Sequence, residues 1–69
     1  MTSVAHTLYR RTLGAVADLE LVHKEYAAEY GLMEGGEHVT HLLRSALTEA
    51  HFAAQEMKRY LERHGVLVD

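Results

Sequence analysis

The sequence predicts an all-α fold, a single domain over residues 1–69 in which an antiparallel hairpin of two long helices pairs with a second copy into a four-helix bundle. Proline is absent, so no residue forbids long uninterrupted helices. Apolar residues recur at helical spacing on both sides of a glycine-rich segment at 31–36, which is typical of a chain reversal. With 69 residues and no cysteine, the chain buries little surface and has no disulfide, so oligomerisation is the remaining common source of stability.

The first helix is expected over about residues 3–30. Thr2 or Ser3 supplies the hydroxyl that caps its free backbone N–H groups. Glu20 and Lys24 are spaced i,i+4 and support the helix from its polar side. The apolar residues that recur at helical spacing, and that are expected to form one stripe, are Val4, Leu8, Ala15, Leu19, Val22 and Tyr26.

The chain reversal is expected at residues 31–36, where three of the five glycines lie. Gly31 is expected in the left-handed conformation just past the first helix, because glycine carries no Cβ to oppose it. Leu32 is then expected to fold back on Tyr26 or Ala27, as in a Schellman motif.

The second helix is expected over about residues 37–64. Gly65 and Val66 predict a Schellman stop after it, with Leu61 as the apolar contact, and a short tail follows at 65–69. Its expected apolar stripe comprises Val39, Leu43, Ala46, Leu47, Ala50, Ala53, Ala54, Met57 and Leu61.

The apolar residues exceed what one seam between two helices can hide. Leu21 and Phe52 fall on the polar sides of their helices, and these two are the leading candidates for contact with another chain. The plainer alternative is scattered apolar surface, which is common on folded proteins. We expect a self-associating surface drawn from Leu8, Ala15, Leu19, Leu21, Val22, Tyr26, Leu43, Ala50, Phe52 and Met57.

One pattern favours a metal site instead. Glu20 and His23 form a Glu-x-x-His pair, and ferritin-like di-metal bundles use two such pairs with two further glutamates. A hairpin dimer would present the pair twice, and Glu49, near in the antiparallel count, would supply the extra carboxylates. The ligands would then be Glu20, His23 and Glu49, and the metal iron or another divalent ion. The plainer alternative is a solvated Glu20 paired with Lys24.

A second pair of histidines stands at the start of the second helix. His38 and His41 are spaced i,i+3, with Glu34 and Glu37 just before them. Such a set makes at best a weak surface metal site. Protonation of the two histidines near a helix N-terminus would oppose the helix dipole, so a pH-sensitive cluster is also open. The plainest interpretation is a solvated polar face.

Charge and patterning exclude several function classes. The formal charge of −3 disfavours nucleic acid, and acidic residues interleave the basic cluster of Lys58, Arg59 and Arg63. No apolar run reaches the roughly 18 residues of a membrane span, and the first residues lack a signal-peptide pattern. The expected location is therefore cytoplasmic.

The sequence also contains no nucleophile–base motif and no glycine-rich phosphate loop, so an enzyme is not expected. The function that remains is a non-catalytic protein–protein interaction module without a cofactor, such as an adaptor, a regulator or an accessory subunit. Its expected partners are a second copy of itself and another protein.

Overall fold

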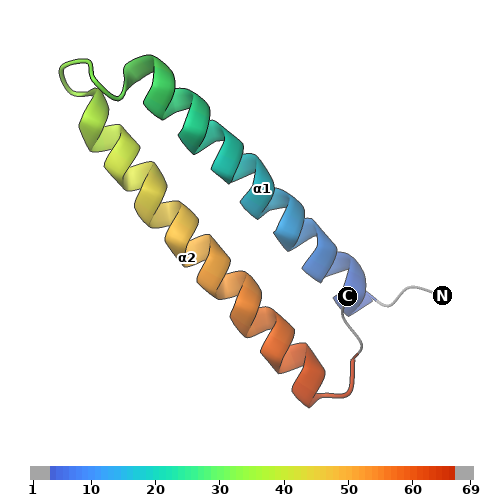
Figure 1. The fold of residues 1–69 in the computed structure, drawn as a ribbon. Coiled ribbons are helices and arrows are strands. Elements are labelled where there is room, and N and C mark those ends of the chain that lie inside the picture. Colours follow the sequence, from blue (N-terminus) through green and yellow to red (C-terminus); the bar gives the residue numbers. More distant parts are fainter. Residues whose placement is uncertain (1–3, 67–69) are drawn as a thin grey trace.

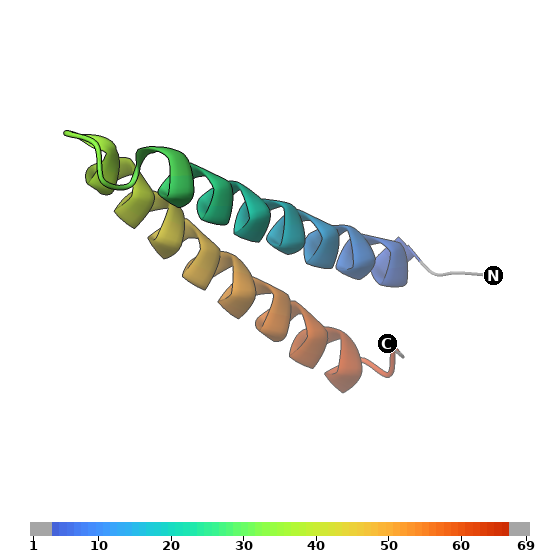
Figure 2. The same ribbon diagram turned by 45° about the horizontal axis from the view of Figure 1, so that its top comes forward.

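The computed structural model describes residues 4–66 and contains two helices, α1 (Val4–Tyr30) and α2 (Gly36–Arg63). The helices run antiparallel, and they remain neighbours along their length in both ribbon views (Figures 1 and 2). The all-helical hairpin expected from the sequence is thus confirmed. The expected caps Thr2 and Ser3, and the tail beyond Val66, lie outside the described residues.

A seam of side chains at heptad positions a and d holds α1 against α2. Spacings of four and three residues alternate along both helices, as in coiled-coil packing. The Thr12 hydroxyl donates to the Leu8 carbonyl oxygen at 2.9 Å and lies 3.7 Å from the Met57 sulfur across the seam. The seam residues, all buried or half-buried, are Ala5, Tyr9, Thr12, Val16, Leu19, His23 and Tyr26 of α1 and Gly36, Thr40, Leu43, Leu47, Ala50, Ala54, Met57 and Leu61 of α2.

The stripe of α1 that faces α2 differs from the expected one. Leu19 and Tyr26 belong to the seam, but Leu8, Ala15 and Val22 are exposed beside it. The cause is that α1 carries apolar residues on two neighbouring stripes, and helical spacing alone does not say which of them meets the second helix.

The chain reverses through a different glycine from the one expected. Gly31 has no positive φ; its N–H donates to the Ala27 carbonyl at 3.0 Å and so continues the helical pattern. Leu32, which the sequence places against the helix, is fully exposed. The left-handed residue is Gly35, with φ 83°, directly before α2. The residue with positive φ therefore lies at the start of the second helix and not at the end of the first.

Gly36 is the residue at which the two ends of the turn meet. It is buried, and its N–H donates to the Met33 carbonyl at 2.9 Å. A Cβ at this position would overlap the carbonyl oxygen of Tyr30. The close approach of the two backbones thus requires a residue without a side chain.

The end of α2 follows the sequence expectation. Val66 donates its N–H to the Leu61 carbonyl at 2.9 Å, and Gly65 donates to the Glu62 carbonyl at 3.1 Å. Gly65 has φ 77°. These two hydrogen bonds and the positive φ together define the Schellman motif that the Gly65–Val66 pair predicts.

Gly65→Ala is expected to lower the free energy of unfolding by about 1 kcal/mol, because an L side chain disfavours the left-handed conformation. Urea denaturation at one fixed protein concentration measures this. Gly65→Asn is the matched control, because asparagine tolerates positive φ better, and it should lose less. Equal stability of the alanine variant and the parent would contradict this role for Gly65.

Candidate interaction surface

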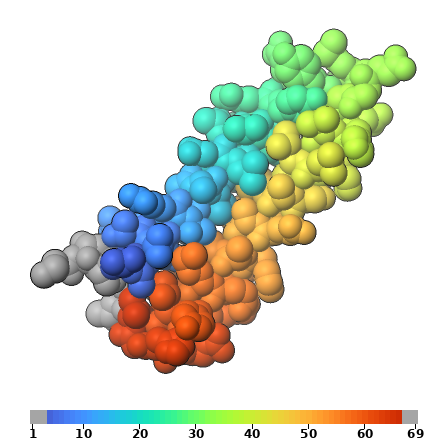
Figure 3. Space-filling view, turned by 180° about the vertical axis from the view of Figure 1, so that it is seen from behind, coloured from blue at the N-terminus to red at the C-terminus, as the bar shows by residue number. Residues whose placement is uncertain are grey.

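The hairpin is a slab one helix thick. Its principal extents are 49, 20 and 13 Å, and the space-filling view shows α1 and α2 side by side in one layer (Figure 3). Among the described residues only three hydrophobic side chains are buried: Tyr9 at 7% exposed, Val16 at 6% and Ala54 at 5%. A slab of this kind has a seam inside but two broad faces outside.

The two broad faces can be assigned from the seam. Where two helices pack antiparallel through positions a and d, their g positions border the seam on one side and their e positions border it on the other. On the g side, eight residues border the seam: six are apolar, one is the amphipathic Tyr60, and one, Glu29 near the turn, is charged. Without Glu29, seven remain. We call this set the apolar face: Leu8, Ala15 and Val22 of α1, and Val39, Ala46, Ala53 and Tyr60 of α2.

All seven residues of the apolar face are exposed in the single chain. The outer positions of the same side carry two more exposed apolar residues, Val4 and Leu42, and six charged ones: Arg11, Asp18, Glu25, Glu49, Glu56 and Arg63. The only charged side chain at a g position of either helix is Glu29, near the turn. The apolar face is thus a long, narrow strip that carries no charge of its own over its middle and is bordered by charged side chains along both outer edges.

The opposite face is polar. Its e positions carry His6, Leu13, Glu20 and Ala27 in α1 and Glu37, Arg44, His51 and Lys58 in α2. Six of these eight side chains are charged or carry an imidazole, and side chains of these kinds are usually exposed to solvent. The contrast between the two faces singles out the apolar face as the candidate interaction surface.

Residue size varies along the apolar face. Ala15, Ala46 and Ala53 lie in its middle, whereas Leu8 and Tyr60 lie toward the termini and Val39 lies toward the turn. Small side chains let another helix approach closely, and larger ones on either side offer apolar area to it.

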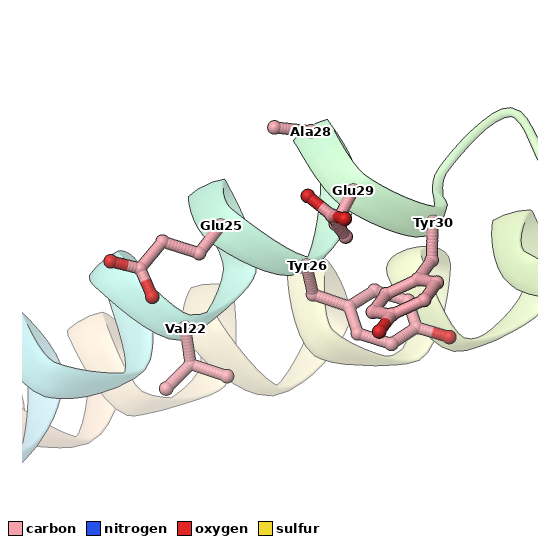
Figure 4. Close-up of a pocket in the computed structure, with 6 residues that line it drawn as sticks. All are labelled: Val22, Glu25, Tyr26, Ala28, Glu29 and Tyr30. Atoms are coloured by element: carbon pink, nitrogen blue, oxygen red, sulfur yellow. The ribbon is translucent and has the colours of Figure 1, made fainter.

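Aromatic side chains extend the surface toward the turn. The rings of Tyr26 and Tyr30 lie with centroids 5.1 Å apart, and Figure 4 shows them on the same side of α1 as Val22. Together with Glu25 and Glu29, these residues line a shallow hollow on α1. The carboxylate of Glu25 lies at the outer edge of the apolar face, and that of Glu29 lies at its turn end.

The residues expected at an interface fall into three groups. Leu8, Ala15 and Val22 lie on the apolar face. Leu21 and Phe52 occupy f positions, the side of each helix turned away from the seam, and both are exposed. The others belong to the seam within one chain: Leu19, Tyr26, Leu43, Ala50 and Met57.

The candidate metal ligands are not brought together within one chain. Glu20 lies on the polar face, Glu49 lies at an outer position beside the apolar face, and His23 is half-buried in the seam between them. Across residues 4–66, no group of three or more His, Asp or Glu side chains is placed to hold a metal ion. His38 and His41 are both exposed. A site shared between two chains stays a prediction.

Part of the apolar face falls in the stripe that the sequence predicts for the core. Val39, Ala46 and Ala53 were expected in the stripe that packs on the first helix, and Tyr60 was not singled out. Val39, Ala46, Ala53 and Tyr60 follow one another at intervals of seven, the same period as the seam residues, so spacing alone reveals a further stripe without saying which stripe meets the first helix. A second seven-residue series beside the seam indicates a second packing surface.

Neither α1 nor α2 has an apolar stretch that would reach across a bilayer, as judged over the described part of the chain. Comparison of the chain with protein-family models, with curated proteins and with solved structures finds no match.

Proposed function

We propose that this chain is a non-catalytic protein–protein interaction module that works as a homo-oligomeric helical bundle. The observation that carries the proposal is the apolar face, a run of exposed apolar side chains on one side of a slab in which three hydrophobic residues are buried among residues 4–66. Exposed apolar surface of this extent is typical of a protein contact. In such a bundle the chain acts as an adaptor, a regulator or an accessory subunit.

The area of the hairpin supports the same proposal. Its accessible surface is 5597 Å² for a mass of 7.8 kDa. A compact monomer of that mass exposes about 4,400 Å². The hairpin therefore exposes about 1,200 Å² more than a compact chain of its size, and association is the direct way to remove this excess from water.

The outward side chains Leu21 and Phe52 give the bundle a place for a different protein. They lie on the backs of α1 and α2, away from the apolar face, and both are exposed in the single chain. In the proposed role, these two side chains supply apolar area for a smaller contact with a second partner.

Mass in solution tests the proposal. Sedimentation equilibrium between about 1 and 100 μM should give at least twice the monomer mass of 7.8 kDa, and the melting temperature should rise with concentration because only the folded chain associates. A folded species of monomer mass with a concentration-independent melting temperature would overturn the proposal. The same measurement with and without added divalent metal shows whether assembly depends on metal.

A further inference from the structure

We infer that the apolar face is the surface on which the second copy docks, face to face about a two-fold axis, and that Leu21 and Phe52 stay outside this contact. The inference rests on the proposed function and goes beyond it by choosing one of the surfaces that the single chain offers. It also departs from the sequence expectation, in which Leu21 and Phe52 were the leading contacts.

The distribution of charge favours a copy of the same chain as the occupant. In a two-fold contact each side chain on the face meets the same set of side chains on the other copy. A charged face would then bring like charges together, and their repulsion would weaken the binding. Leu8, Ala15 and Val22 with their four counterparts on α2 carry no charge, and Glu29 lies at the end of the face near the turn. Two copies can thus meet without burying a like-charge pair at the centre.

Area gives the second argument. A stable protein contact of standard size removes about 800 Å² from each partner. The excess surface of about 1,200 Å² estimated for this hairpin is larger than that requirement. A slab 49 Å long and 20 Å wide presents one broad face of matching size. Covering the polar face instead would bury the charged side chains of Glu20, Arg44 and Lys58.

The size pattern completes the argument. Ala15, Ala46 and Ala53 in the middle of the face leave room for the backbone of a facing helix. The larger side chains at the ends of the face then contact the two helices of the other copy; they are Leu8, Tyr60 and Val39. Two such faces placed middle to middle form the second seam of a four-helix bundle, whose first seam is the one inside each hairpin.

Two neighbouring residues provide a matched test. Val22 on the apolar face is 49% exposed and Leu21 on the back of α1 is 54% exposed. Val22→Glu should weaken self-association at least about 100-fold, because the carboxylate enters an apolar contact twice. Leu21→Glu, of similar exposure in the single chain, should change it less than about threefold. Sedimentation equilibrium at several concentrations measures both, with circular dichroism recording helix content.

The outcomes separate the inference from the proposed function. A parent chain that is monomeric and folded overturns the proposed function and the inference together. A dimeric parent that survives Val22→Glu but dissociates with Leu21→Glu overturns the inference alone. Loss of helix in Val22→Glu, at a concentration where Leu21→Glu is folded and dimeric, supports the inference, because a lone hairpin exposes both positions equally.

A chemical measurement does not depend on these variants folding alike. The chain has no cysteine, so a single introduced thiol is the only one present. Ala53→Cys lies on the apolar face and Gln55→Cys lies on the polar side of the same helix, both exposed. A short bifunctional maleimide should join two copies of Ala53→Cys much faster than two copies of Gln55→Cys. Equal rates, or the reverse order, would overturn the inference.

Discussion

Gly36→Ala is expected to lower the free energy of unfolding by about 3 kcal/mol. The new Cβ overlaps the carbonyl oxygen of Tyr30. This oxygen belongs to the backbone, so no change of side-chain rotamer can move it out of the way. Relief requires the start of α2 to move away from the end of α1, and this breaks the Gly36 N–H bond to Met33. A domain of 69 residues has about 3–10 kcal/mol of stability in total, so the variant should be partly unfolded or nearly so.

Gly14→Ala is the matched control for this substitution. Gly14 lies inside α1 on its outward side, and a Cβ there meets no atom within 4 Å. Alanine favours the helix over glycine by about 1 kcal/mol, so this variant should be more stable than the parent. Urea denaturation of both variants at one chain concentration measures the pair. Opposite signs are expected; a Gly36→Ala variant at least as stable as the parent would mean that the turn is not packed as the structure has it.

Tyr9→Ala is expected to lower the free energy of unfolding by about 3 kcal/mol. Tyr9 is one of the three buried hydrophobic residues and lies in the half of the seam near the termini, as do Val16 and Ala54. Truncation removes most of the apolar contact between the two helices at that level. With so small a core, no neighbouring side chain is available to fill the space.

Phe52→Ala is the control, since it truncates a large aromatic side chain in the other helix. Phe52 is 62% exposed and points away from the seam. Its loss should change the stability by less than about 0.5 kcal/mol, and alanine's helix propensity acts in its favour. Thermal melting at matched concentrations compares the two. A cost for Phe52→Ala as large as that for Tyr9→Ala would place Phe52 in a contact between chains.

Much of the fold follows from residue patterns that act locally. Helical spacing without proline predicts two long helices, and the Gly65–Val66 pair predicts the stop that follows the second. The turn is harder, because Gly31, Gly35 and Gly36 are all able to take the left-handed conformation. Which of them does so depends on how the two helices align when packed. This alignment is a property of the two packed helices together and cannot be read from the sequence of either segment alone.

The candidate surface was only partly accessible to sequence reasoning for a similar reason. Leu8, Ala15 and Val22 recur every seven residues and were expected at a contact. Tyr9 and Val16 recur in the same way one position later in the chain, and they are the ones that meet α2. Two neighbouring stripes with the same period become distinguishable only when the second helix is in place, since packing decides which stripe is covered.

Because the hairpin is elongated, the length of a linker that joins two copies can show how the copies are oriented. The first turn of α1 and the last turn of α2 lie at one end of the molecule, and residues 31–35 lie at the other, along a 49 Å axis (Figure 1). Joining two copies in tandem, from the end of one to the beginning of the next, needs only a short tether if both reversals point the same way. If they point in opposite directions, the tether must span the whole axis, about 15 extended residues. A series of tandem chains with increasing tether lengths therefore reports the relative direction of the two copies. The quantity to measure is the shortest tether at which the two linked copies pair with each other, so that the tandem chain is a monomer in solution.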